Sequence, residues 1–444
     1  CGHSVWSIPE EEDASVRKII RRETKELGEL RTSQLITSFG VGAIVDFRDE
    51  TAILGGADDW YRNPEEDKAR MLRCHNLEKI LDKQFFVKPK CDKKQRAIYK
   101  RSYSHDFGAD RFPSVLYCPS CTRLWSEKEL AGLQKGELCC PRCGKRLVPS
   151  RFIVVCRHGH IDDFPYSLWV HRGKPCEKQE GDKPQKLKLF NINGRTNLGS
   201  LMVSCEDCGK IRSMQEAFVP EALASVYKCL GRQPWLEHDD FHGCSEKAVV
   251  RMRTSTGVYM PVNISALNIP PWSTNVSKIL LSHLDAMEGK NETALLNYIR
   301  RILSPYLPGV PVNQILATYK TLISVVHLKH PTSVKELYEE EYRALCEEAE
   351  DEKSDFCSRR IIVPAKHRDL IDEVTPVDRL TEIVAMVGFT RLQGWDGKMD
   401  SPSLAPIFSY DPKTWLPAID MHGEGIFIRF NEHKIEEWEK NNST

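Results

Sequence analysis

Two cysteine turns decide the fold of this chain: Cys118-Pro-Ser-Cys121 and Cys140-Pro-Arg-Cys143-Gly144. Their spacing falls within the C-x2-C-x15–20-C-x2-C pattern of a four-cysteine zinc site. Two thiolates on one tight turn, here called a knuckle, hold one face of a tetrahedral ion, and a second knuckle closes the other face. Because four thiolates leave no ligand position for water or substrate, we predict a zinc ribbon with one structural Zn2+. Its ligands would be Cys118, Cys121, Cys140 and Cys143.

A third knuckle, Cys205-Glu-Asp-Cys208-Gly209, needs two further ligands to complete a second zinc site. We favour Cys229 and Cys244, which follow it in the sequence, so that the second site would also hold four thiolates. The alternative is that this knuckle binds its metal with another pair of ligands. The upstream candidates for that pair are Cys156, His158, His160 and Cys176.

Cysteine usage and charge limit where the chain acts and what it binds. The 444 residues include 16 cysteines, and knuckles in a chain of this length indicate metal ligands in a reducing compartment rather than disulfides. We therefore expect a cytoplasmic protein, and no apolar run approaches the ~18 residues of a membrane span. Because 63 Lys and Arg residues balance 63 Asp and Glu residues, nucleic-acid binding would have to come from local patches.

A histidine-rich turn, Cys156-Arg-His158-Gly-His160-Ile-Asp162-Asp163, follows the apolar run 152–155. It is close to the H-x-H-x-D-H motif of metallo-β-lactamase-fold hydrolases and nucleases, but Asp163 stands where the final His ligand is needed. We favour a polar turn in which His160 and Asp162 hydrogen-bond to nearby backbone. The alternative is a metal-dependent nuclease that uses His158, His160, Asp162 and Asp163.

The sequence contains no G-x-x-x-x-G-K-[ST] phosphate loop, so we expect no ATPase activity and predict that the chain is not an enzyme. A basic stretch at 88–104 alternates cations with tyrosines, a composition that can follow a phosphate backbone and stack against bases. A solvated loop is an equally favoured reading of this stretch. The residues predicted to bind nucleic acid are Lys93, Lys94, Arg96, Lys100 and Arg101.

The length exceeds what one hydrophobic core usually supports, and the composition changes along the chain, so we predict a multi-domain α+β protein. Four regions are expected: an N-terminal α+β region with a β-hairpin and the basic loop (1–110), the zinc ribbon (111–150), a second Cys/His-rich zinc-binding β region (151–270) and a mainly helical region (271–444). The middle would be rich in loops and cross-linked by zinc. We expect the hairpin at 43–54, helices within 276–350 and at 377–388, and a strand at 426–430 followed by a helix.

Several segments, taken in order, resemble the DrmB family of helicase-associated subunits from the DISARM anti-phage defence system. The longest read R-x-S-Q-L-I-T-x-F-G-V-G-A-I-V-D-F at 31–47 and V-C-x-x-G-H-I-D-D-F-P-Y-x-x-W-V-H at 155–171. Shorter matching segments lie at 111–121, 205–213, 229–236, 265–270 and 380–391. The resemblance covers most of residues 31–438.

This resemblance implies a non-ATPase subunit that pairs with a superfamily-2 helicase of the DrmA type. Helicase and subunit would together engage and remodel DNA, with ATP hydrolysis supplied by the helicase and DNA contacted mainly within the complex. The family continues beyond the segment that ends near Trp438, so we expect further family motifs outside this sequence. A rival interpretation is a free-standing zinc-ribbon adaptor that binds DNA without a helicase.

Overall fold

The computed structural model divides into two compact units, each assembled from separate stretches of the chain. Unit 1 holds Cys1–Arg62, Lys90–Val262 and Val387–Pro412, and unit 2 holds Asn63–Pro89, Asn263–Met386 and Lys413–Thr444. The structure describes residues 26–442 except 49, 62–66, 90–95, 99–106, 132–137, 180, 182, 193–196, 220, 237, 241–242, 327–330, 332, 350–353 and 411–412. Helices and several sheets occur together, which confirms the α+β class.

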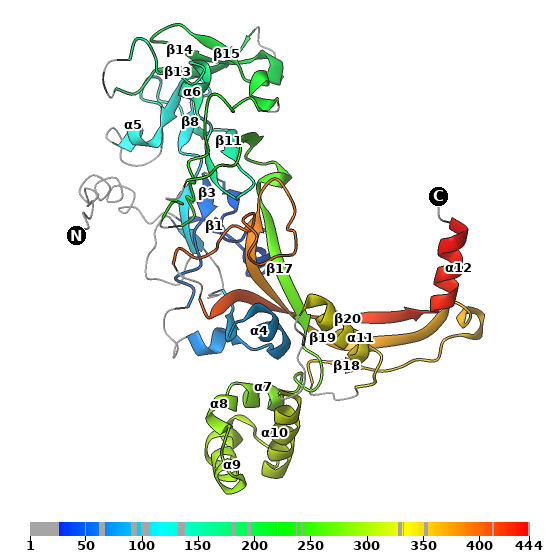
Figure 1. Cartoon of the computed structure of the whole chain (residues 1–444). Helices are drawn as coiled ribbons and strands as arrows, with labels where there is room; N and C mark the ends of the chain where they lie inside the picture. Colours follow the sequence, from blue (N-terminus) through cyan, green and yellow to red (C-terminus); the bar gives the residue numbers. More distant parts are fainter. Residues whose placement is uncertain are drawn as a thin grey trace, which may run out of the picture. The chain divides into compact units, whose positions relative to one another are not determined.

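The N-terminal part of unit 1 forms a five-stranded sheet with the strand order β1-β6-β7-β3-β2. Strands β1 and β3 of this sheet are labelled in Figure 1. The predicted hairpin is confirmed, because β2 and β3 pair antiparallel with Ile44 opposite Ile53. The elements are β1 (Glu26–Glu29), α2 (Gln34–Thr37), β2 (Ile44–Asp46), β3 (Thr51–Leu54), β6 (Arg96–Ile98) and β7 (Phe107–Arg111).

The middle of the chain forms three small sheets, with the orders β10-β8-β9, β12-β11-β16 and β13-β14-β15. Their strands have only two to five residues, and each of these sheets is antiparallel. A shared core that includes the fully buried Trp169 and Phe164 lies among them. The elements are β8 (Val115–Tyr117), β9 (Leu124–Ser126), α5 (Glu127–Ala131), β10 (Val148–Pro149), β11 (Phe152–Val155), β12 (Ile161–Asp163), α6 (Tyr166–Val170), β13 (Leu187–Asn191), β14 (Leu201–Cys205), β15 (Ile211–Ser213) and β16 (Val249–Met252).

A late segment of the chain, Val387–Pro412, completes unit 1 through the fully buried side chain of Arg391. Its guanidinium donates hydrogen bonds to three backbone carbonyls that are far apart in the sequence. The Arg391 nitrogens lie 2.8 Å from the Gly159 oxygen and 2.9 Å from the Gly42 oxygen, and a third bond reaches Val258. Burial lowers the pKa of Arg391, since the charged form loses water.

Aromatic rings surround this buried cation. The guanidinium carbon lies 4.7 Å from the ring centroid of Phe389 and 5.2 Å from that of Trp235, within the range of cation–π attraction. The Phe389 ring also presses against Gly42, which has a φ of +78°, and a Cβ there would overlap the ring. Position 42 therefore accepts only glycine, both for its backbone conformation and for this close approach.

Replacing Arg391 by Met should destabilise the chain, because Met keeps an apolar side chain of similar length but leaves three buried carbonyls without their donor. We expect the free energy of unfolding to fall by about 3 kcal/mol. Urea unfolding followed by tryptophan fluorescence would measure the loss. Lys398→Met, at an exposed position of the same segment, should change stability by less than about 0.5 kcal/mol. Equal stability of the two variants would contradict the role given to Arg391.

The helical part of unit 2 follows the predicted periodicity, which is confirmed within 276–350. Side chains cap three of these helices: the Thr274, Asn291 and Ser333 oxygens each accept a hydrogen bond from a backbone N–H three residues further on. Leu280, Ile299 and Leu322 lie in their common core. The helices are α7 (Asn275–Leu281), α8 (Leu284–Met287), α9 (Glu292–Tyr298), α10 (Val312–Val326) and α11 (Val334–Leu345). No helix in the described ranges is long and apolar enough to span a membrane.

The prediction of a helix at 377–388 is wrong, because this segment belongs to a long strand, β19 (Ile371–Thr390). It pairs antiparallel with β20 (Trp415–Phe430), with Ala385 opposite Ala418. Residues 383–390 are all buried, so the alternation that marks a half-exposed strand is missing, and a continuous apolar run can be read as either type. The region 271–444 is therefore less helical than expected.

The sheet of unit 2 has the order β17-β19-β20-β5-β4, with β18 beside β19. The predicted strand and following helix near the end of the chain are confirmed in β20 and α12 (Glu432–Asn442). The remaining elements are β4 (Met71–Leu72), α4 (His75–Leu81), β5 (Phe85–Val87), β17 (Met260–Leu267) and β18 (Cys357–Ser358).

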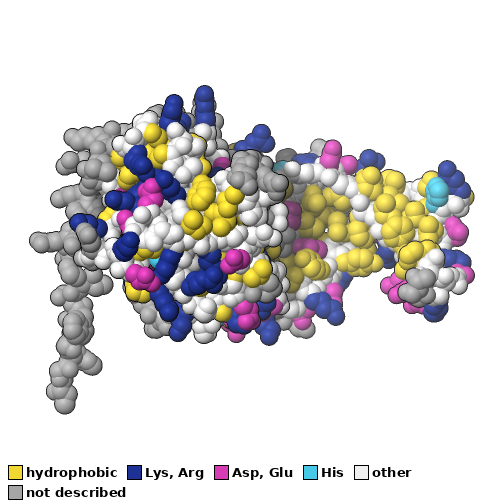
Figure 2. All heavy atoms as spheres, turned by 90° about the horizontal axis from the view of Figure 1, so that it is seen from above, with side chains coloured by type: hydrophobic (Ala, Val, Ile, Leu, Met, Phe, Trp, Pro, Cys, Tyr) yellow, Lys and Arg dark blue, Asp and Glu magenta, His cyan; other side chains and the backbone are white. Residues whose placement is uncertain are grey.

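One face of the ribbon formed by β19 and β20 exposes apolar side chains, which gather into a continuous surface (Figure 2). Directly opposite residues share a face, and the pairs on this side are Ile371–Phe430, Val374–Ile428 and Pro376–Ile426. Exposure reaches 70% at Ile426, 46% at Phe430 and 43% at Ile428. The opposite face is covered, since Glu373, Thr375 and Val377 are buried. These six paired residues are called the apolar ribbon face below.

Candidate metal centres

The four cysteines predicted for the zinc ribbon lie together, with their sulfur atoms all within 4.8 Å of one another. The Sγ atoms of Cys118 and Cys143 are 3.4 Å apart, and those of Cys121 and Cys140 are 3.5 Å apart. The first knuckle connects β8 to β9, and a hydrogen bond from Thr122 N–H to the Cys118 carbonyl (2.9 Å) closes the turn. This group is called the ribbon cluster.

The thiols of the ribbon cluster differ in acidity. Burial raises the pKa of Cys118 to about 12. The exposed Cys143 accepts hydrogen bonds from the Lys145 backbone N–H and the Cys118 thiol, which lower its pKa to about 6. Proton loss at the remaining thiols is therefore coupled to metal binding, as is general for thiolate sites.

The knuckle Cys205–Cys208 joins His171 and Cys176 in a second group, the hairpin cluster, on the β14–β15 hairpin. His171 directly follows α6, where its Nδ1 donates to the Ser167 carbonyl at 2.8 Å. That bond leaves Nε2 free to face the metal position, 3.3 Å from the Cys208 sulfur. Burial opposes ionisation of Cys208, yet hydrogen bonds to its sulfur, led by the one from the Lys210 N–H, lower its pKa to about 7.

Cys229 and Cys244 join Cys156 and His160 in a third group, the turn cluster, which begins where β11 ends. The Nδ1 atom of His160 is 3.4 Å from the Cys156 sulfur, and its Nε2 is 3.4 Å from a carboxylate oxygen of Asp240. A carboxylate on the second ring nitrogen fixes the orientation of a metal-binding histidine. The hydrogen bond from the Cys156 thiol lowers the pKa of Cys229 to about 4.

The structure separates the two cysteine pairs that the sequence pattern groups in one site. Cys205 and Cys208 lie in the hairpin cluster, whereas Cys229 and Cys244 lie in the turn cluster. The physical reason is the packing of α6 against the β14–β15 hairpin, where the Arg212 guanidinium stacks over the ring of Trp169 at 3.4 Å. This packing brings the helix end, with His171, to the knuckle.

Four residues of these groups are not among the ligands that the sequence pattern favours: Cys156, His160, His171 and Cys176. One signal points to Cys156, because each group has a cysteine at or just after the end of an apolar strand. Cys118 follows β8, Cys156 follows β11 and Cys205 ends β14. His171 and Cys176 carry no such signal, since they depend on where α6 packs.

The donor sets fit zinc, which prefers four thiolate or imidazole ligands at structural sites. The ribbon cluster offers four sulfurs, and the other two clusters each offer three sulfurs and one imidazole nitrogen. Each group could hold a metal ion without leaving a ligand position for substrate. Zn2+ stays a prediction as the identity of that ion.

The four residues of the nuclease alternative have separate partners. His160 lies in the turn cluster, and His158 lies beside it, with Nδ1 3.6 Å from the Cys244 sulfur. Asp163 accepts hydrogen bonds from the N–H groups of Ser114 and Val115, and burial raises its pKa. Asp162 accepts from the Tyr227 hydroxyl at 2.9 Å, and burial raises its pKa too.

The basic stretch predicted to bind nucleic acid is mostly outside the described residues. Lys93, Lys94, Lys100 and Arg101 all fall outside the described part of the chain. Arg96 begins strand β6, which pairs with β1 and β7, so part of this stretch is a strand rather than a loop.

Comparison with known proteins adds two findings. Residues 31–260, slightly more than half of the chain, match the family model described as a domain of unknown function (DUF8724). The chain is also 28% identical over 389 residues to the DISARM protein DrmB of Bacillus paralicheniformis. That alignment covers 83% of this chain and 66% of the relative, so the chain spans just under two thirds of that protein's length. The resemblance to DrmB expected from the motifs is confirmed.

Metal analysis of variants should distinguish three clusters from the grouping predicted from the sequence. The purified chain should carry three zinc ions, and the double variant Cys205→Ser with Cys229→Ser should carry one, because it breaks two separate clusters. Had these cysteines shared one site, the double variant would lose a single ion. Mass spectrometry of the metal content per chain would give the count.

Cys139→Ser provides the matched control for this experiment, since Cys139 precedes a ligand but lies outside all three groups. It should leave the zinc content at three. Loss of only one ion from the double variant would contradict the assignment of these cysteines to different clusters.

Proposed function

The chain belongs to the family defined by the domain of unknown function DUF8724, and from this premise we propose that it is a subunit of a DISARM anti-phage defence machine. In this proposal it binds a superfamily-2 helicase of the DrmA type in the cytoplasm and assists that helicase in engaging and remodelling DNA. The helicase hydrolyses ATP, and the chain contributes no catalysis of its own. One observation carries the proposal: the similarity to DrmB extends well beyond the family domain.

The closed metal clusters support a structural role for the zinc ions. Every cluster has four ligand atoms from the protein, so a bound ion would have no open position for a water nucleophile. The chemistry of the proposed machine would then lie in its partner. Cross-linked loops of this kind provide rigid surfaces on which another protein can dock.

The apolar ribbon face supports a protein as the partner. Monomeric proteins rarely expose a contiguous apolar surface of this kind, and interfaces are where such surfaces usually become buried. Here Ile426, Ile428 and Phe430 follow one another on one side of β20, each at least 43% exposed. We assign this face to the helicase subunit.

Two other functions remain as alternatives. A nuclease would need His158, His160, Asp162 and Asp163 around one metal, whereas each of these residues has a different partner. DNA cleavage by the purified chain that is lost in Asp162→Asn would favour this alternative. A free-standing adaptor would bind DNA fully without the helicase, and the DNA-binding experiment below tests that reading.

The isolated chain should bind DNA weakly, because its 63 basic and 63 acidic residues give no net positive field. The weak binding should still depend steeply on salt, because it would come from contacts between the basic stretch and phosphates. The complex with the helicase should bind more tightly. Changing Lys93, Lys94 and Arg96 together to Glu should weaken binding by the complex and reduce the slope of log affinity against log salt by up to about 3. Fluorescence anisotropy over a salt series would measure both quantities.

Lys366 and Lys398, exposed cations outside the basic stretch, provide the control, and changing both to Glu should leave the slope unchanged. Equal affinity of the isolated chain and the complex would favour the adaptor. An unchanged slope in the triple variant would make the basic stretch a solvated segment without a role in DNA binding.

Ile428→Glu should abolish capture of the co-expressed helicase, because it places a charge at the centre of the apolar ribbon face. Ile302→Glu makes the same change at an isoleucine of matched exposure, 42% against 43%, in the helical part of unit 2. We expect that control to retain full capture. Affinity pull-down with quantification of both subunits would measure the effect, and equal capture by the two variants would refute the assigned face.

A further inference from the structure

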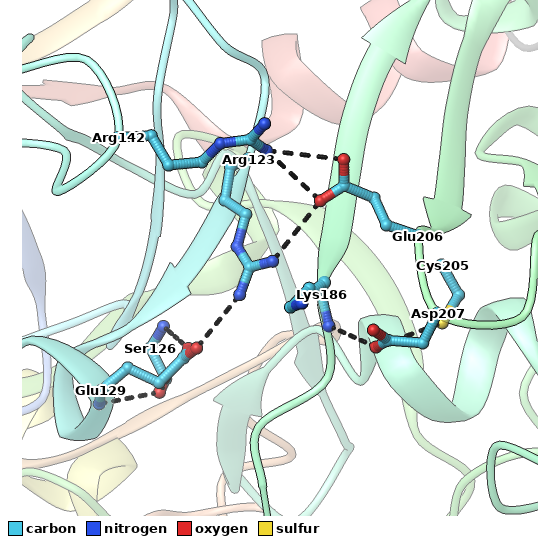
Figure 3. A network of polar contacts seen from close by, with 8 residues as sticks. All are labelled: Arg123, Ser126, Glu129, Arg142, Lys186, Cys205, Glu206 and Asp207. Atoms are coloured by element: carbon cyan, nitrogen blue, oxygen red, sulfur yellow. Dashed lines mark hydrogen bonds and ion pairs between the residues drawn. The ribbon is translucent and has the colours of Figure 1, made fainter. Parts of the chain in front are cut away.

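One carboxylate, that of Glu206, connects two of the three metal clusters (Figure 3). Glu206 lies inside the knuckle of the hairpin cluster, between Cys205 and Cys208. Arg142 lies inside the second knuckle of the ribbon cluster, and its Nη1 is 3.3 Å from a Glu206 oxygen. Arg123, two residues beyond the first ribbon knuckle, places its Nη1 3.5 Å from the same oxygen.

Lys188 of β13 is the nearest cation to Glu206, at 2.6 Å, but it belongs to neither cluster. Of the two arginine contacts, the one with Arg123 has the greater structural weight, because only 6% of that side chain is exposed. Its guanidinium lies between Glu206 and Glu129, with a 3.4 Å contact to Glu129, and stacks over the Trp125 ring at 4.7 Å. A cation with so little access to water depends on the carboxylates around it. Its backbone carbonyl also accepts the Cys118 N–H at 2.9 Å, which ties Arg123 to the ribbon knuckle.

Backbone hydrogen bonds along β13 connect the same two knuckles. The Leu189 N–H donates to the Thr122 carbonyl of the ribbon turn at 2.9 Å. Just before β13, the Lys186 carbonyl accepts from the Glu206 N–H at 2.7 Å, and the Lys186 N–H donates to the Asp207 carboxylate at 2.9 Å. The middle of β13 and the residue just before this strand are therefore hydrogen-bonded to the turns of the two clusters.

We propose that the ribbon and hairpin clusters bind metal cooperatively, with Glu206 as the positioning residue that couples them. An ion in the ribbon cluster fixes the turns that present Arg123 and Arg142, and these cations then hold Glu206 with its flanking cysteines in the ligand geometry. Coupling of this kind is reciprocal, so an ion in the hairpin cluster favours the ribbon cluster equally. The turn cluster has no part in this network of ion pairs and binds independently.

A thermodynamic cycle tests the coupling on the full chain. Cys229→Ser removes the turn cluster, and adding Cys118→Ser removes the ribbon cluster, so that the hairpin cluster alone remains. We expect competition with a chromophoric zinc chelator to show about tenfold weaker zinc binding at the hairpin cluster once the ribbon cluster is lost. In a Glu206→Gln background this difference should shrink to less than about twofold.

Glu177→Gln is the matched control, because Glu177 pairs with Lys210 at 2.6 Å beside the hairpin cluster and is the neighbour of Cys176. It should preserve the tenfold difference. Hairpin affinity that is unchanged by Cys118→Ser would overturn the proposal, and so would coupling that survives Glu206→Gln. The outcome is independent of any DISARM role, since it is read from zinc affinity alone.

A second measurement avoids variants of the ligands, in case these do not stay folded. Excess chelator should remove two zinc ions from the unmodified chain in one joint phase and the third in a separate phase. Glu206→Gln should divide the joint phase into two, whereas Glu177→Gln should not. Three independent phases in the unmodified chain would refute the coupling.

Discussion

Three four-ligand clusters bring together the short strands and turns in the middle of this protein. The strands there have only two to five residues, and sheets of this size need packing against other elements to be stable. Each cluster brings together residues from turns that are distant in the sequence, such as Cys156 and Cys244 in the turn cluster. The free energy of metal binding at such a site is folding free energy. An ion bound in these clusters would therefore stabilise the elements that surround the shared core of Trp169.

Some parts of the structure could be predicted from local patterns in the sequence alone. The ribbon spacing brought Cys118, Cys121, Cys140 and Cys143 to one point, because both knuckles lie on neighbouring short hairpins. The β2–β3 hairpin and the helices within 276–350 follow equally from local periodicity. In these places, each element is specified by residues within its own stretch of chain.

Other parts depend on contacts that no local pattern reveals. The partners of Cys205 and Cys208 are set by α6, which places His171 at the knuckle only because Trp169 packs under Arg212. The run at 383–390 is buried on both faces, so its strand has no alternation to display. The two units are also discontinuous in sequence, and composition gave no sign that residues 387–412 belong with the first half of the chain.

Because Arg391 is buried in unit 1, the unit of folding includes residues that lie outside the family domain. The matched domain ends at residue 260, yet unit 1 requires a segment that lies more than a hundred residues further along the chain. A recombinant fragment cut at the domain boundary would expose the buried ring of Trp235 and leave three interior carbonyls unsatisfied. Such a fragment would tend to aggregate, and its insolubility would say nothing about the intact protein. Homologues trimmed to the shared domain before expression would inherit the same defect.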